Sequence, residues 1–86
     1  MYVVVMHEVS DPAGFWSALQ DAEKGVMPEG RRLHYFLPSP DASKIACLWQ
    51  APTVDDVKAL VEPAFGAVSK NDFFEVDAEK AAGLPA

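Results

Sequence analysis

The strands that this sequence predicts are apolar on both faces. Residues 2–9 read Tyr-Val-Val-Val-Met-His-Glu-Val, and residues 45–49 read Ile-Ala-Cys-Leu-Trp. A strand with one face in water alternates apolar and polar residues, because its successive side chains point to opposite sides. These two runs do not alternate. A sheet built from them needs cover on both faces, and the chain has only two helical segments to provide it.

The segment after the first strand predicts a helix. Asp11 can accept hydrogen bonds from the free N–H groups at a helix start, and Pro12 suits the first helical position. We expect this helix to end near Gly25. Its apolar residues recur at helical spacing and form one stripe, which consists of Phe15, Leu19, Ala22 and Val26.

A second helix is predicted in the second half of the chain. Thr53 and Asp56 have the spacing of a capping box, with Asp in place of the usual Glu or Gln. Pro63 cannot continue a helix without the loss of a hydrogen bond, so we expect the helix to end near Glu62. Its buried stripe is predicted to consist of Val54, Val57, Leu60, Val61 and Ala64.

Three further strands complete the order β-α-β-β-α-β. We expect them at residues 33–37, 44–50 and 73–76, with a turn rich in Pro, Ser and Asp between the first two. This order predicts an α+β, ferredoxin-like fold, in which an antiparallel four-stranded sheet carries both helices on one face. We expect one domain over residues 1–77 and a loosely held C-terminal tail over residues 78–86.

The face of the sheet without helices then has no cover from the predicted domain. A second copy of the chain is the expected cover, because large exposed apolar surfaces usually mark interaction sites. Two such sheets packed face to face form a homodimer. The interior between them is either filled by side chains or holds a small ligand or an ion.

Composition excludes several classes of partner. A net charge of −6 argues against nucleic acid and against anionic membranes, since both are bound mainly through Lys and Arg. No apolar run approaches the roughly 18 residues of a membrane helix, and the first residues lack the basic segment of a signal peptide. The single cysteine, Cys47, excludes an intramolecular disulfide and favours a cytoplasmic location. We expect Cys47 to be a small buried hydrophobic residue.

Three side chains are candidates for a divalent metal site: His34, Glu75 and His7. Imidazole and carboxylate groups suit nickel or zinc. Each histidine can equally be a strand residue that bonds to backbone or water. Strict alternation places His7 with Val3 and Val5 on one face of the first strand.

Three aromatic residues are candidates for the wall of a ligand pocket: Trp49, Phe36 and Tyr35. Large aromatic side chains also fill cores, and that alternative stays open. Strict alternation places His34 with Phe36 on one face of the second predicted strand, and Tyr35 with Leu33 and Leu37 on the other. No Gly-rich phosphate loop is present, and no organic cofactor is expected.

The element order and the apolar sheet resemble the dimeric α+β barrel superfamily, which includes cofactor-independent monooxygenases and muconolactone isomerase-like enzymes. The second half of the chain resembles a family of short uncharacterised proteins with a nickel-responsive, nickel-binding member. That likeness lies in Leu33-His34-Tyr35, in the run 45–52, in Asn71 and in the run 74–76. It places His34 and Glu75 on family-like positions, whereas at His7 a different polar residue is expected.

These observations leave open functions of different classes. The first is a small cytoplasmic homodimeric binding protein that holds a divalent metal, nickel or zinc, or a small ligand between the two sheets. The second is a cofactor-independent monooxygenase or isomerase, in which His7 or His34 removes a proton from a small substrate held against Trp49 and Phe36. A purely structural or interaction role is the third.

Overall fold

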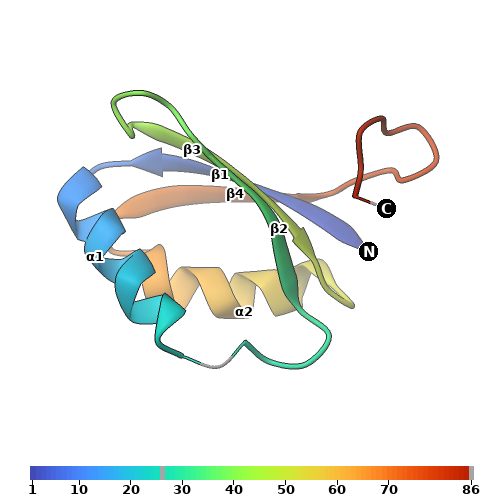
Figure 1. The fold of residues 1–86 in the computed structure, drawn as a ribbon, viewed down its shortest axis with the longest axis horizontal. Helices are drawn as coiled ribbons and strands as arrows, with labels where there is room; N and C mark the ends of the chain where they lie inside the picture. Colours follow the sequence, from blue (N-terminus) through green and yellow to red (C-terminus); the bar gives the residue numbers. More distant parts are fainter. Residues whose placement is uncertain (26, 86) are drawn as a thin grey trace.

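The computed structural model describes residues 1–25 and 27–85, so Val26 of the predicted stripe and Ala86 of the predicted tail lie outside the described residues. One antiparallel sheet has the strand order β2-β3-β1-β4, and both helices lie on the same face of it (Figure 1). This confirms the ferredoxin-like fold. The elements are β1 (Tyr2–Val9), α1 (Pro12–Glu23), β2 (Arg32–Pro38), β3 (Lys44–Gln50), α2 (Val54–Phe65) and β4 (Ser69–Glu75).

The core lies between the sheet and the helices. Val3, Val5 and His7 of β1 are buried, whereas Met6, which lies between Val5 and His7, is 42% exposed. The odd positions of β1 therefore face the helices. A fully buried side chain of this size contributes about 1.5–3 kcal/mol through the hydrophobic effect. The buried core residues are Val3, Val5, Phe15, Ile45, Cys47, Trp49, Ala51, Val57, Val61 and Phe65.

Both helices begin where local capping predicts. The Asp11 carboxylate accepts a hydrogen bond from the Gly14 N–H at 3.0 Å, and Pro12 opens α1. At α2, Thr53 and Asp56 form the capping box in both directions. The hydrogen bond from Thr53, together with the nearby Arg31 guanidinium, holds the pKa of Asp56 below its usual value. The two helix starts are thus determined by residues next to them in the sequence.

Helix α2 continues past Pro63 to Phe65, so the predicted end near Glu62 is wrong. Pro63 lacks the N–H that would bond to the preceding turn, but the Gly66 N–H still donates to the Glu62 carbonyl at 2.9 Å. Phe65 is only 8% exposed and stacks on Phe15, with ring centroids 4.6 Å apart. Tertiary packing of this last turn therefore outweighs the missing hydrogen bond.

Strand β4 begins at Ser69, four positions before the predicted start of the strand at residue 73. Its first half, Ser-Lys-Asn-Asp, is polar and does not look like a strand in the sequence. It is held by pairing with β1, where Ser69 lies opposite Val9 and Asn71 lies opposite His7. Long-range pairing thus determines this strand.

Strand β2 contains a register shift at His34. Leu33 lies opposite Trp49 and Tyr35 lies opposite Leu48, so His34 is an extra residue of the kind found in a β-bulge. Leu33 therefore packs with the core, as does Phe36. The prediction that His34 shares a face with Phe36, and Tyr35 with Leu33, is wrong. The additional residue reverses the alternation of faces along the strand.

Candidate functional site

The open face is the side of the sheet without helices. Its apolar residues come from all four strands, and several of their side chains project into solvent. Leu37 is 61% exposed, Phe74 52%, Met6 42% and Tyr35 40%. Exposed apolar side chains gathered on one face indicate an interaction surface. The apolar residues of the open face are Val4, Met6, Tyr35, Leu37, Ala46, Leu48 and Phe74.

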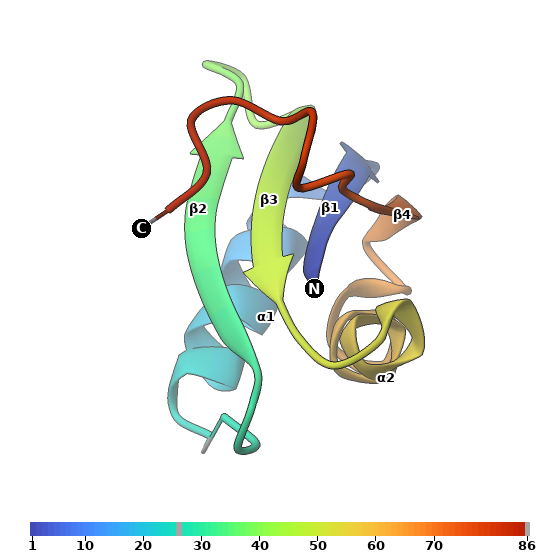
Figure 2. The ribbon, with the colours of Figure 1, turned by 90° about the vertical axis from the view of Figure 1, so that its right-hand side faces the viewer.

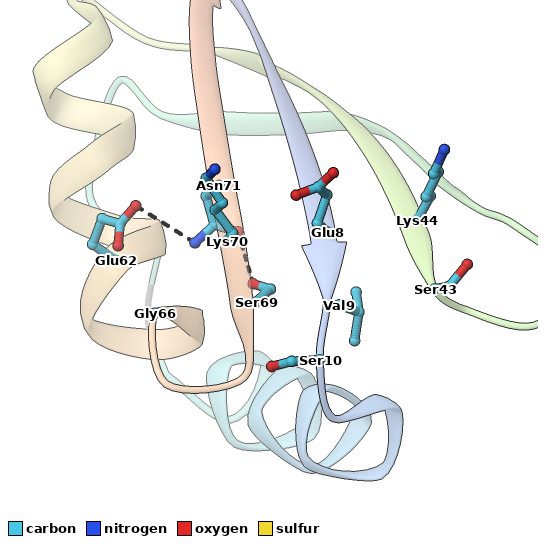
Figure 3. A pocket seen from close by; sticks show the side chains of 10 residues that line it. All are labelled: Glu8, Val9, Ser10, Ser43, Lys44, Glu62, Gly66, Ser69, Lys70 and Asn71. Carbon is cyan, nitrogen blue, oxygen red and sulfur yellow. Dashed lines mark hydrogen bonds between the residues drawn. The ribbon is translucent and has the colours of Figure 1, made fainter.

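A charged row borders one end of the open face. Glu8 of β1 lies directly opposite Lys44 of β3 on one side and Lys70 of β4 on the other. Residues opposite each other in a sheet share a face, so the three side chains form a row of alternating charge (Figure 3). An apolar centre with a polar border is the usual arrangement of a protein interface.

The C-terminal tail, residues 78–85, crosses part of the open face (Figure 2). The Tyr35 hydroxyl donates to the Gly83 carbonyl at 3.2 Å, and the Tyr2 hydroxyl donates to the Pro85 carbonyl at 3.3 Å. Leu84 is half-buried, and Leu48 of the open face is only 8% exposed. A cavity of about 220 Å³ remains between the tail and the sheet, and it is lined mainly by apolar residues.

His34 lies at the edge of the open face. Its Nε2 is 2.9 Å from Gln50 Oε1, and its ring is 5.7 Å from the ring of Tyr2. The amide oxygen of Gln50 is an acceptor, so Nε2 carries the proton in the neutral ring and Nδ1 presents a lone pair. This nitrogen has the chemistry of a metal ligand or a proton acceptor.

Glu75 lies on the other side of the sheet. It is opposite Val3 in the register and therefore shares the helix-bearing face, although its own side chain is exposed. His34 belongs to β2 and Glu75 to β4, which are the two edges of the sheet. One chain therefore does not bring these two candidates together.

His7 is 3% exposed and faces the helices, with the rings of Phe15 and Phe65 at 5.2 and 6.0 Å. Its position beside Val3 and Val5 confirms the predicted alternation of β1. Burial lowers the pKa of His7, and the hydrogen bond to Asn71 and the carboxylate of Glu62 oppose this only in part. The neutral ring is therefore the stable form in the core.

Asn71 connects the buried histidine to the surface. Its side-chain oxygen accepts from His7 Nδ1. The same oxygen accepts from the Ser69 hydroxyl, and the amide nitrogen donates to Glu62 Oε1 at 3.5 Å (Figure 3). These contacts fix His7 in one orientation. Across residues 1–25 and 27–85, no three His, Cys, Asp or Glu side chains gather in a way that would hold a metal ion.

An open polar hollow of about 750 Å³ borders this network at the end of the sheet with the charged row, and Asn71 and Ser69 form part of its wall (Figure 3). Its walls include Glu8, Lys44, Glu62 and Lys70, but not His7. Sequence reasoning did not single out these four charged residues. Strand alternation alone places Glu8 with Met6, but only the pairing of β1 with both neighbours reveals the row.

The three predicted pocket aromatics lie on two faces. Trp49 and Phe36 point toward the helices, and the Phe36 ring lies 5.7 Å from that of Trp16, whereas Tyr35 is on the open face. Trp49 also lines a mainly apolar cavity of about 280 Å³ beside α2. Its buried indole N–H has no hydrogen-bond partner among the described residues. The three aromatic residues therefore do not line one common pocket in this chain.

Cys47 faces the core and is 5% exposed. Burial raises the pKa of its thiol to about 12. The thiolate, which is the nucleophilic and metal-binding form, is therefore not populated near neutral pH. The structure agrees with the interpretation of Cys47 as a small buried hydrophobic residue.

In the part of the chain that the structure describes, no helix has the length and apolar character needed to cross a membrane. Comparisons with models of known protein families, with curated proteins and with solved structures found no significant match. The resemblance to the dimeric α+β barrel superfamily, which rests on the element order and the apolar sheet, therefore stays a prediction beyond the ferredoxin-like fold itself. The resemblance to the nickel-binding protein stays a prediction.

Proposed function

We propose that this chain acts in the cytoplasm as a homodimeric binding protein, in which two open faces pack together and enclose a small ligand. The observation that carries this proposal is the apolar surface of the open face, where Leu37 and Phe74 on the two edge strands are more than half exposed. Exposed apolar area contributes about 25 cal/mol per Å² when it is removed from water. Contact with another apolar surface would therefore lower the free energy of this face.

A second copy has the chemistry that this surface needs. In a two-fold symmetric contact, the same surface of each protomer meets itself. The apolar surface of one protomer then covers the apolar surface of the other, as in the packing of two sheets face to face. The charged row contains both signs of charge, so a lysine of one protomer could pair with Glu8 of the other.

The cavity of about 220 Å³ under the tail supports a small, mainly apolar ligand. It is slightly smaller than typical ligand pockets, which measure roughly 300–1,000 Å³. Two open faces that pack together would bring the sheet walls of two such cavities, which include Val4, Leu37 and Leu48, next to each other. The Tyr35 hydroxyl at the wall supplies one polar group that could orient a ligand.

A divalent metal, nickel or zinc, is the second candidate ligand, and the place of His34 favours it. The Nδ1 lone pair of His34 lies at the edge of the open face, so a two-fold contact would contain one such group from each protomer. Glu75 and His7 are on the other face, so they would not join this site. Calorimetric titration with nickel and zinc should give saturable heat that His34→Ala removes. An unchanged affinity in that variant would exclude this ligand set.

The dimer is tested by one charge placed on the apolar surface of the open face. Leu37→Lys should convert the protein to a folded monomer, because a lysine ammonium would be buried in the contact without a partner. Ala13→Lys places the same charge on the exposed surface of α1 and should leave the dimer intact. Light scattering gives the mass, and circular dichroism checks the fold. A Leu37→Lys variant that remains dimeric would contradict the proposed interface.

A further inference from the structure

The C-terminal tail occupies the centre of the surface that the proposed dimer needs. Ala82, Gly83 and Leu84 of the tail share one cavity with Val4 and Leu48 of the sheet. Figure 2 shows the tail passing over the open face in front of β3 and β2. The burial of Leu48 to 8% exposure shows that part of the centre is already covered by the chain itself.

The tail and a second sheet cannot cover this centre together. Sheets that pack face to face lie about 10 Å apart, and their side chains fill the space between them. A chain segment that lies on Val4 and Leu48 takes up that space. For the two sheets to come into full contact, the tail must first leave the centre of the face.

The ties that hold the tail are few. Two tyrosine hydroxyls, Tyr35 and Tyr2, donate to its carbonyls at 3.2 and 3.3 Å, which is longer than the usual O–H···O distance of about 2.7–2.8 Å. Leu84 is its one large apolar side chain between residues 78 and 85, and it is only half-buried. Cover of this kind is weaker than a second sheet that contacts the whole apolar centre.

We infer that the C-terminal tail is a strap that competes with a second copy of the chain for the open face. This inference rests on the proposed function, because it assigns the regulation of the same surface. The chain with the tail in place is the closed monomer. Release of the tail exposes the apolar centre and permits the dimer, so the stability of the tail contact sets the concentration at which dimers form.

Leu84→Ser is the variant that tests this competition in the full chain. It weakens the strap without a change to the sheet, and it adds no charge. The dissociation constant of the dimer should decrease by about tenfold, since the contribution of a half-buried leucine to the closed state is lost. Ala81→Ser is the matched control, because Ala81 is exposed in the same tail and should leave the dissociation constant unchanged. Sedimentation velocity over a range of concentrations measures both.

Trypsin gives a second readout at Lys80, which lies within the tail. At a concentration where the chain is monomeric, cleavage after Lys80 should be faster in Leu84→Ser than in Ala81→Ser, because the strap is released more often. A dimer whose dissociation constant is the same in both variants would overturn the strap and leave the proposed function standing. No association in any variant would overturn the proposed function and the competition with it, whatever the rate of cleavage.

Discussion

At the scale of single residues, His7 shows what a sequence pattern can and cannot determine. The alternation of β1 correctly groups His7 with Val3 and Val5. It does not say that this group faces the helices, because both faces of the strand are apolar in the sequence. The contact of His7 with Asn71, 64 positions away, follows only from the pairing of β1 with β4. His7 is therefore a buried core residue in the chain, although its type suggested a site.

The burial of His7 predicts how stability depends on pH. Its pKa is lowered in the folded state from the usual 6.5, so below that pH the unfolded chain binds a proton that the folded chain does not. The free energy of unfolding should therefore decrease as the pH falls below 6.5. Glu62 on α2 and the neutral Asn71 on β4 are the polar groups that face the ring, and they reduce this effect only in part.

Two histidine variants isolate this effect. Urea unfolding at about pH 7.5 and about pH 5.5 should show a smaller loss of stability in His7→Leu than in the unsubstituted protein. His34→Ala removes the other histidine and should keep the full loss, because His34 lies at the edge of the open face. An equal loss in His7→Leu would mean that other groups control the pH dependence.

At the scale of elements, local signals predicted the starts of both helices and the whole of β1 and β3. Capping by Asp11 and Thr53 depends on neighbours within three positions, which the sequence displays directly. The end of α2 and the start of β4 depend instead on tertiary packing of Phe65 and on pairing with β1. These contacts join distant positions, and a periodic pattern does not contain them.

The extra residue in β2 leads to a prediction about the strand. Because Leu33 and Tyr35 lie opposite the consecutive residues Trp49 and Leu48, deletion of His34 should leave the register on both sides unchanged. The fold should survive, with circular dichroism and cooperative urea unfolding like those of the unsubstituted chain. Deletion of Phe36 is the matched control. It would move the residues on one side of the gap to the wrong face and should greatly reduce stability.

If the two deletions destabilised the protein equally, the extra residue in β2 would be needed for the fold. Equal tolerance of both deletions would mean that β2 as a whole contributes little. The deletion removes the residue from the strand, whereas His34→Ala removes only the imidazole. Comparison of the two variants therefore separates the role of the extra residue from the role of its side chain. The deletion therefore tells whether the position of His34 serves the open face rather than the sheet.

At the scale of the whole molecule, the sequence predicted one sheet face without cover from the helices. The structure confirms that both helices lie on the other face, and it adds a partial cover that the sequence did not reveal. The tail is composed mainly of small residues and carries no apolar period, so nothing in it predicts a contact with Tyr35 or Tyr2. The apolar area left exposed still includes Leu37 on β2 and Phe74 on β4.

This remaining exposed surface should bind a second copy of the chain. Sedimentation velocity of the full chain, from low micromolar to several hundred micromolar concentration, tests it most directly. The mass should shift from that of one chain, 9.3 kDa, to twice that value as the concentration rises. A single species with the mass of one chain over the whole range would contradict it.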